Sequence, residues 1–518
     1  MTILDLTDVP YEQDIRELFM AFYPGEVFAS GRSAEDRTGL RKESRRSEDD
    51  GTALKEVRDN VTRHLTGTRD GELYRFTLAV TDENSDADDG VRSWSSHIED
   101  SRFETKCNIK KDLYEVLCVL TGRTLPWGTL TGIRPTRLIL DRLDEGEDPG
   151  TVRRDFEAKF LPQKEKLDLC METALREKKV LSESGEDGFS LYIGVPFCPT
   201  RCLYCSFTAY PISVWQEKTD AYTDTLMKEI QAVSGIMEGT GLKSVYMGGG
   251  TPTSLSAQQL SRIFEAVGKY FPDSGIGSGY SAGSGKCEFT VEAGRPDSIT
   301  AEKLEAMHEY GVDRISVNPQ TMNDETLKLI GRLHTTDMIR EKFELARRYG
   351  FDNINTDIII GLPGEDESHV EHTMRELEKL GPDSITVHSL AVKSKAGLAE
   401  RDDRFSLHGA LQISRMLDIA SSACRQMGLS PYYMYRQKNM AGNFENVGYC
   451  TPGKECLYNI FIMEERQTII GCGAGTSTKI ALGHGAGVKR IENVRDPQLY
   501  MDRIDEMIKR KEVCNGTY

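Results

Sequence analysis

The chain has 518 residues, of which 38% are hydrophobic and 28% are charged, and this composition excludes a disordered or fibrous protein. Its 65 Lys and Arg residues against 82 Asp and Glu residues give a net charge of −17, which disfavours general binding to nucleic acids or anionic membranes. The sequence contains no run of about 18 apolar residues, so it predicts no membrane span, and the acidic N-terminus contains no apolar signal core. We therefore expect a cytoplasmic protein whose 12 cysteines are mostly reduced.

Residues 1–105 are predicted to form an N-terminal α+β accessory domain. Its periodicity predicts a helix over 12–23 and a strand over 71–80, while two charged segments, 30–51 and 82–89, are expected to be mobile loops. Residues 106–187 are predicted to form a helical connector. It contains Arg134 and Arg137, which either contact an anionic substrate or are ordinary surface charges.

From residue 188 the pattern changes to short β-branched runs that alternate with helical stretches. The expected strands are 191–195, 243–247, 288–291, 314–317, 353–360 and 384–387. The expected helices between them are 217–237, 257–271, 301–311, 338–350 and 367–380. This alternation predicts an α/β fold with parallel strands and right-handed crossovers, namely a partial (β/α)6 TIM-like barrel over 188–400.

Two further segments accompany the barrel. A flexible loop is expected over 273–285, because this stretch is rich in glycine and serine. Residues 401–518 are predicted to form a smaller C-terminal domain, a lid or substrate-side element that begins with a helix over 405–428.

The strongest chemical signal is a closely spaced set of three cysteines, Cys198, Cys202 and Cys205, directly after the first barrel strand. A structural zinc site needs four ligands, and no further Cys or His lies nearby, so both zinc and coincidental buried thiols are disfavoured. Three thiolates on a [4Fe–4S] cluster leave one iron open, and an open coordination position implies a bound substrate.

Other polar and glycine-rich features fall where the next strands end. A Gly-Gly-Gly-Thr-Pro segment, 248–252, follows the second strand, Glu292 ends the third, Gln320 follows the fourth and Asp357 lies late in the fifth. Barrel active sites form at this carboxyl end of the strands. The glycines alone predict only a turn, but beside three cysteines they favour close approach of a ligand to backbone N–H groups.

The cysteine set and the Gly-Gly-Gly-Thr-Pro segment resemble the radical S-adenosylmethionine (SAM) superfamily. Further stretches resemble its oxygen-independent coproporphyrinogen III dehydrogenase group, above all the longer Z-type variant with an extra N-terminal domain. These stretches are 191–198, 205–207, 291–296, 315–320, 355–363 and 449–456. The resemblance implies a [4Fe–4S] cluster whose open iron binds SAM, and one electron that splits the sulfonium into methionine and a 5′-deoxyadenosyl radical.

The resemblance also implies the reaction and its partners. The radical takes a hydrogen from the β-carbon of a propionate, and loss of CO₂ and an electron leaves a vinyl group. Two such steps turn coproporphyrinogen III into protoporphyrinogen IX, a step of haem biosynthesis. An electron donor such as a flavodoxin or ferredoxin is then a partner.

By the same resemblance, the SAM and the cluster are bound by residues from several strand ends. Tyr192 and Tyr204 are expected to flank them, and Gly249, Gly250 and Thr251 to bind the methionine end of SAM. The rest of SAM, including its ribose and carboxylate, is expected to contact Glu292, Gln320, Arg332 and Asp357. The contact to the adenine stays unassigned near His388. Arg332 is alternatively an ordinary helix-surface residue.

Two positions depart from the dehydrogenase pattern and keep alternatives open. Phe207 stands where these enzymes have a further Cys, a substitution shared with a haem-chaperone relative, whereas 456–461 lacks the complete motif of that chaperone. The alternatives are a haem-binding chaperone and a radical SAM enzyme that acts on another tetrapyrrole. Cys450 and Cys456 belong to a lid or are structural thiols, and Arg436 and Lys438, with Arg332, are candidate partners of substrate carboxylates.

Overall fold

The computed structural model describes residues 1–23, 26–30, 61–82, 90–132, 134–185, 187–207, 209–277, 287–390, 409–436, 444–483 and 487–514. Of the loops expected over 30–51, 82–89 and 273–285, residues 31–51, 83–89 and 278–285 lie outside the described residues, as does Lys438, whereas Ser30 and Asp82 end strands. Within them, none of the helices combines the length and the apolar character needed to cross a membrane.

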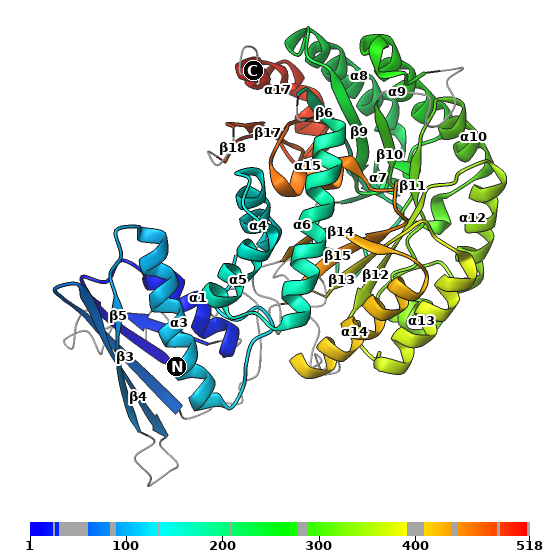
Figure 1. Cartoon of the computed structure of the whole chain (residues 1–518). Coiled ribbons are helices and arrows are strands. Elements are labelled where there is room, and N and C mark those ends of the chain that lie inside the picture. The colour runs from blue at the N-terminus through cyan, green and yellow to red at the C-terminus, as the bar shows by residue number, and fades with distance from the viewer. Residues whose placement is uncertain are drawn as a thin grey trace.

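The N-terminal region is a five-stranded sheet with the order β2-β1-β3-β4-β5 and helices packed on one face (Figure 1). The strands are β1 Thr2–Thr7, β2 Phe28–Ser30, β3 Val61–Asp70, β4 Leu73–Asp82 and β5 Val91–His97. Helix α1 (Glu12–Phe22) buries Ile15, Leu18 and Phe19 against this sheet, which confirms the predicted helix and the predicted strand within β4.

Helices connect this region to the larger sheet, and Figure 1 shows α4, α5 and α6 between the two. The helices are α3 Arg102–Thr121, α4 Pro135–Asp144, α5 Pro149–Phe160 and α6 Lys164–Ser184. Arg134 and Arg137, ahead of and within α4, both contact the carboxylate of Glu465, at 2.7 and 3.1 Å. These two arginines therefore fasten the connector to the C-terminal part of the chain, and the prediction that they meet an anionic substrate is not supported.

The larger sheet contains the predicted parallel strands with helices on their outer side, a partial TIM-like barrel, so the expected fold class is confirmed (Figure 1). The parallel strands are β6 Phe189–Val195, β9 Leu242–Gly249, β10 Glu288–Val291, β11 Arg314–Ser316, β12 Ile354–Ile360 and β13 Ser384–Ser389. The helices are α8 Thr219–Ile236, α9 Ala257–Tyr270, α10 Ala301–Glu309, α11 Asp324–Leu329, α12 Thr336–Arg348 and α13 Glu367–Leu380. The short helix α11 was not predicted.

The C-terminal segment adds strands to both ends of this sheet. After α14 (Ala410–Gln426), β14 (Ser430–Arg436) and β15 (Glu445–Cys450) extend it beside β13, and β16 (Thr468–Cys472) pairs with β6 in parallel. Strands β17 (Ser477–Ala481) and β18 (Val488–Glu492) follow at that end. The segment expected as a smaller domain thus shares the barrel's sheet, and the division of the chain into four domains stays a prediction.

Helix α15 (Leu457–Glu464) closes the barrel at the end where its strands begin. Tyr458 stacks on Tyr246 of β9 with ring centres 4.4 Å apart, and Asn459 donates a hydrogen bond to the Tyr432 hydroxyl of β14 at 3.2 Å. The Glu288 carboxylate of β10 accepts the Leu457 N–H at 2.7 Å and so caps the first turn of α15. The helix therefore spans between distant strands of the sheet and forms the floor of the barrel.

Strand alternation decides which side chains face the inside. Ile315 and Val317 of the β11 segment point outward into the apolar core under the helices, as do Ile385 and Val387 of β13. The residues between them point inward and are mostly polar. The barrel interior is therefore a polar space that runs from the floor at α15 to the mouth at the carboxyl ends of the strands.

Candidate active site

A cavity of about 360 Å³ occupies the barrel interior and opens beside the cysteine loop. The residues predicted from the sequence to bind the cluster and SAM line this cavity, with the exception of Tyr192. They are Cys198, Cys202, Cys205, Tyr204, Gly249, Gly250, Thr251, Glu292, Gln320, Arg332 and Asp357. The structure thus brings together side chains from separate strand ends, and their individual roles stay predictions.

Cys198 ends the short strand β7 (Phe197–Cys198), Cys202 and Cys205 lie on the loop that follows it, and all three thiols are free. The Sγ of Cys198 lies 3.4 Å from the Thr251 hydroxyl, and Nη1 of Arg295 lies 3.6 Å from the Sγ of Cys202. Arg295 is buried and is held by Asp297 at 2.7 Å. Its position in the 291–296 stretch was visible in the sequence, but its contact with the cysteine loop was not predicted.

The residues present fit a [4Fe–4S] cluster. Three sulfur donors face one cavity, with buried guanidinium groups beside them to offset negative charge on the sulfurs. Among the described parts of the chain, no three His, Cys, Asp or Glu side chains converge on the position of one metal ion.

Arg332 lies in the loop after α11, where it is buried rather than on a helix surface. Its guanidinium donates to the Tyr204 hydroxyl, with Nη2 at 3.0 Å, and to the carbonyl of Asn318 at 2.8 Å. Arg332 therefore joins the cysteine loop to the end of β11 and also presents positive charge to the cavity.

The glycine segment after β9 packs tightly against the strand that leads to Cys198. The N–H groups of Gly250 and Thr251 donate to the carbonyls of Val195 and Phe197, both at 2.7 Å. These two N–H groups are thus used within the protein, and binding of the methionine end of SAM by Gly249, Gly250 and Thr251 stays a prediction. A Cβ on Gly250 would lie 2.6 Å from the Phe197 carbonyl oxygen, so glycine is required for this close approach.

Glu292 directly follows β10 and lines the same cavity as the cysteines. The Tyr246 hydroxyl donates to its Oε1 at 2.7 Å, and burial raises the pKa of Glu292 to about 7. A Cβ on Gly248 would lie 2.8 Å from the Glu292 carboxyl carbon, so the first glycine of the segment makes room for this side chain. Glu292 is therefore positioned as a hydrogen-bonding group that faces the cavity.

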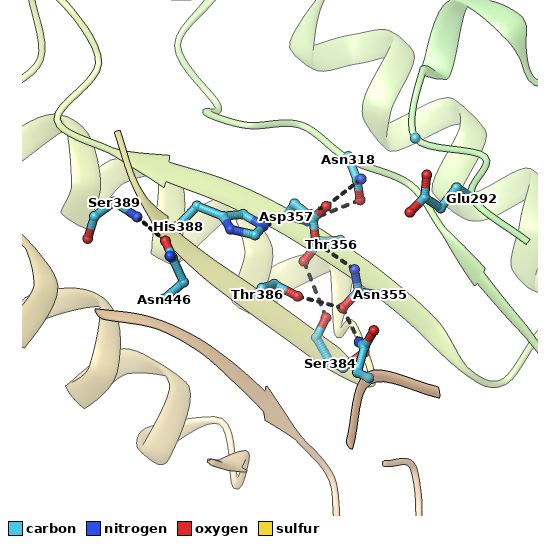
Figure 2. A network of polar contacts seen from close by, with 12 residues as sticks. Glu292, Asn318, Asn355, Thr356, Asp357, Ser384, Thr386, His388, Ser389 and Asn446 are labelled. Carbon is cyan, nitrogen blue, oxygen red and sulfur yellow. Dashed lines mark hydrogen bonds and ion pairs between the residues drawn. The ribbon is translucent and has the colours of Figure 1, made fainter. Parts of the chain in front are cut away.

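Asp357 is fixed by two amide groups, as Figure 2 shows. Asn318 Nδ2 donates to its Oδ2 at 2.7 Å, and Asn355 Nδ2 donates to its Oδ1 at 2.8 Å. Although burial alone raises the pKa of Asp357, His388 and the hydrogen bond from Asn355 lower it below its ordinary value. The Asp357 carboxylate is therefore charged, as the sequence suggested. Its neighbours compensate this charge, and the carboxylate can accept hydrogen bonds.

His388, the last residue but one of β13, lies next to Asp357 and was left unassigned from the sequence. Its Nε2 lies 3.9 Å from Asp357 Oδ2, and its Nδ1 lies 3.5 Å from the Tyr435 hydroxyl. Gln320 completes this side of the mouth in a left-handed conformation with φ of 68°, held by its N–H to the Asp357 carbonyl at 2.9 Å.

Tyr192 lies behind the cavity wall, where its ring stacks on Tyr246 and Tyr458 at 6.1 and 5.8 Å. Arg436 does not line the cavity either, because its Nη1 donates to the Leu130 carbonyl at 2.6 Å. Arg314 lines it instead, from the floor. Its inward position follows from strand alternation along β11, a signal that the sequence contained.

Comparison with known proteins gives consistent results. Residues 192–377 match the family described as the Radical SAM superfamily. The chain is 40% identical to the oxygen-independent coproporphyrinogen-III oxidase-like protein HemZ of Bacillus subtilis, over 76% of this chain and 77% of that one. It is 32% identical to the heme chaperone HemW of Bacillus subtilis, over 61% of this chain and 76% of the relative. Coproporphyrinogen III oxidase (HemN) from Escherichia coli, a radical SAM enzyme, shares the fold with a TM-score of 0.50 and 22% identity, over 64% and 72% of the two chains.

Proposed function

Because the chain belongs to the radical SAM superfamily, in its group of oxygen-independent coproporphyrinogen-III oxidase-like proteins, we propose that it decarboxylates coproporphyrinogen III without oxygen. Each of two propionates loses one hydrogen atom, CO₂ and one electron and becomes a vinyl group. The product is protoporphyrinogen IX, and an external one-electron acceptor takes the electron. The observation that supports the proposal is the single cavity that runs from three free thiols to a polar barrel floor.

The proposed division of labour follows from the contacts in the cavity. Cys198, Cys202 and Cys205 would hold the cluster, and when bound the reduced cluster and SAM supply a carbon radical that removes a hydrogen atom. Arg295 stabilises the charge on the sulfurs through its contact with Cys202. The Asp357 carboxylate accepts hydrogen bonds from hydroxyl groups of SAM. The walls limit the access of water, which protects a reactive radical from side reactions.

A second candidate function is favoured by one residue at the cavity mouth. Phe207 is 70% exposed, and it stands where the dehydrogenases are expected to carry a further Cys. A haem-binding protein of the chaperone kind would use such an exposed apolar side chain against the face of a porphyrin. The similarity to HemW supports this candidate, which requires haem binding without turnover of coproporphyrinogen III.

One anaerobic experiment separates the two candidates. Purified protein with a reconstituted cluster is incubated with SAM, coproporphyrinogen III, a reduced flavodoxin or ferredoxin and an electron acceptor, and the tetrapyrroles are identified by mass. The proposal expects protoporphyrinogen IX together with 5′-deoxyadenosine. Stoichiometric haem binding with neither product would establish the second candidate instead, and another tetrapyrrole product would identify a different substrate.

The role of Asp357 is tested separately. Asp357→Ala should weaken the equilibrium binding of SAM by at least about tenfold, since a compensated buried acceptor is lost, while the iron and sulfide content stays that of the parent protein. Equal losses of cluster and SAM binding would contradict the assigned role.

A further inference from the structure

Two residues on the inner face of β11 have no part in the function proposed above. Arg314 begins the strand and Ser316 ends it, and both line the cavity near its floor. They are 3% and 5% exposed. Because side chains two residues apart on a strand share a face, both point into the same space, below Asn318 at the mouth.

The hydroxyl of Ser316 is buried and makes no hydrogen bond to any residue that the structure describes. Buried hydroxyl groups in proteins nearly always have a partner, because an unmade hydrogen bond destabilises the fold. An unpartnered hydroxyl that faces a cavity is therefore evidence for a polar group that binds there.

Arg314 presents a second unused donor in the same place. Its Nη1 donates to the Asn353 side chain at 3.3 Å and to the Lys454 carbonyl at 3.2 Å, and its Nη2 donates to the Asn355 side chain at 3.0 Å and to the Tyr432 hydroxyl at 3.5 Å. Its Nε has no partner among the described residues.

The charge of Arg314 also lacks a direct counter-charge. No carboxylate of the described residues lies within 4.0 Å of its guanidinium. Glu288, on the adjacent strand β10, directs its carboxylate at α15, where it accepts the Leu457 and Tyr458 N–H groups at 2.7 and 3.4 Å. A buried cation with no anion in contact is unfavourable unless an anion from outside completes the site.

The neighbouring polar groups leave this part of the cavity rich in donors. The Asn355 carbonyl oxygen accepts from Arg314, from Ser384 at 3.1 Å and from Thr386 at 3.3 Å, so it is already in use (Figure 2). Its amide nitrogen is turned to Asp357 at 2.8 Å. The floor thus offers the guanidinium of Arg314 and the unpartnered hydroxyl of Ser316, two donors that suit a carboxylate.

We propose that Arg314 and Ser316 form a binding site for a carboxylate group at the floor of the cavity. If the proposed function holds, that group is a propionate of the tetrapyrrole substrate. Ser316 and Asn318 are about 7 Å apart along the strand, which is a distance that a propionate side chain can bridge from the mouth. Recognition by these two residues would then select substrates with acidic side chains.

The first test needs no tetrapyrrole. Sodium propionate and its neutral analogue propionamide are titrated, at matched ionic strength, against the thermal unfolding midpoint of the anaerobically purified protein. The proposal expects propionate to raise the midpoint more than propionamide does. An equal effect of the two compounds would overturn it, whatever the protein does with porphyrins.

The decisive variant is Ser316→Val, which removes the unpartnered hydroxyl, adds a methyl group to the cavity and suits a strand. Ser316→Val should keep or raise the stability of the protein. It should abolish the additional rise of the unfolding midpoint that propionate causes over propionamide. Arg314→Gln should abolish it as well. The matched control Ile315→Val lies on the outer face of the same strand, so it should lower the midpoint slightly and leave the propionate effect intact. An unchanged propionate effect in Ser316→Val would refute the site.

The second test links the site to the substrate class. Binding of coproporphyrin III, the stable oxidised form, and of its tetramethyl ester is followed by fluorescence. Ser316→Val should weaken binding of the free acid at least about tenfold and leave ester binding and SAM affinity unchanged. If propionate acts as expected but no coproporphyrin binds, the proposed function fails while the carboxylate site stands. Equal affinity of the wild-type protein for acid and ester would overturn its use for a tetrapyrrole.

Discussion

The substitution Gly250→Ala tests how strongly the glycine segment positions the cysteine loop. Gly250 lies against Phe197, the residue directly before Cys198. A Cβ at this position would lie 2.6 Å from the Phe197 carbonyl oxygen and 3.0 Å from its N and C atoms. All three are backbone atoms, so no side-chain rotation relieves the contact.

The size of the effect follows from these distances. An ordinary carbon contact begins at 3.4 Å, so the Phe197 backbone has to move by roughly 0.8 Å. The hydrogen bonds from Gly250 and Thr251 to the β6–β7 segment resist this movement, since both are 2.7 Å long. Overpacking of this kind costs about 1–3 kcal/mol. Because the displaced atoms lead directly into Cys198, we expect a lower cluster content as well as a lower stability.

The assay compares iron and sulfide content after anaerobic reconstitution, SAM affinity and urea unfolding for Gly250→Ala and a matched control. The control is Gly235→Ala in α8, where a Cβ meets nothing within 4 Å and where alanine should stabilise the helix by about 0.5–1 kcal/mol. If Gly250→Ala assembles a full cluster and binds SAM as the parent protein does, the packing argument for this segment is wrong.

Three other outcomes are expected. Cys202→Ala should abolish cluster assembly but change the free energy of unfolding in urea by no more than about 1 kcal/mol, because the cysteine is on a loop. A full iron content would disprove the ligand assignment. Lys511→Met should cost about 3–5 kcal/mol, because it removes the cationic partner of the buried Glu229 carboxylate, which lies at 2.7 Å, whereas Lys509→Met on the same helix should change little. Burial raises the pKa of Glu464 to about 7 from 4.5, so the folded state holds this proton more tightly and the free energy of unfolding falls as the pH rises through that window. In urea unfolding, the free energy of unfolding of Glu464→Gln should fall less between pH 5 and pH 8 than that of the parent protein. The same pH dependence in both proteins would contradict the assignment.

Much of the barrel could be predicted because its strands are local apolar runs. Segments such as 354–360 are rich in β-branched residues, and each is followed by an amphipathic helix. Parallel strands end at one face, so the gathering of Glu292, Gln320 and Asp357 around one cavity followed from their positions after strands.

The parts that escaped prediction depend on long-range pairing or on which side a residue faces. Strand β16 pairs Ile470 with Leu191 of β6, a partner far away in the chain, so no local pattern indicates that β16 belongs to the barrel. Arg134 and Arg137 have the same charge as substrate-binding arginines, and only the fold brings Glu465 to them. A basic residue at the start of an apolar strand, such as Arg314, is easily mistaken for an exposed residue.

The floor of the barrel has a consequence for how the protein is made. Cys205 leaves the ribosome roughly 250 residues before Leu457, which is about 12–50 seconds of synthesis at 5–20 residues per second. During that interval the thiol loop exists without the helix that seals the barrel beneath it, so iron and sulfide can reach it from an open side. In a mature molecule that has lost its cluster this helix is already in place, so we expect iron and sulfide to enter from the mouth.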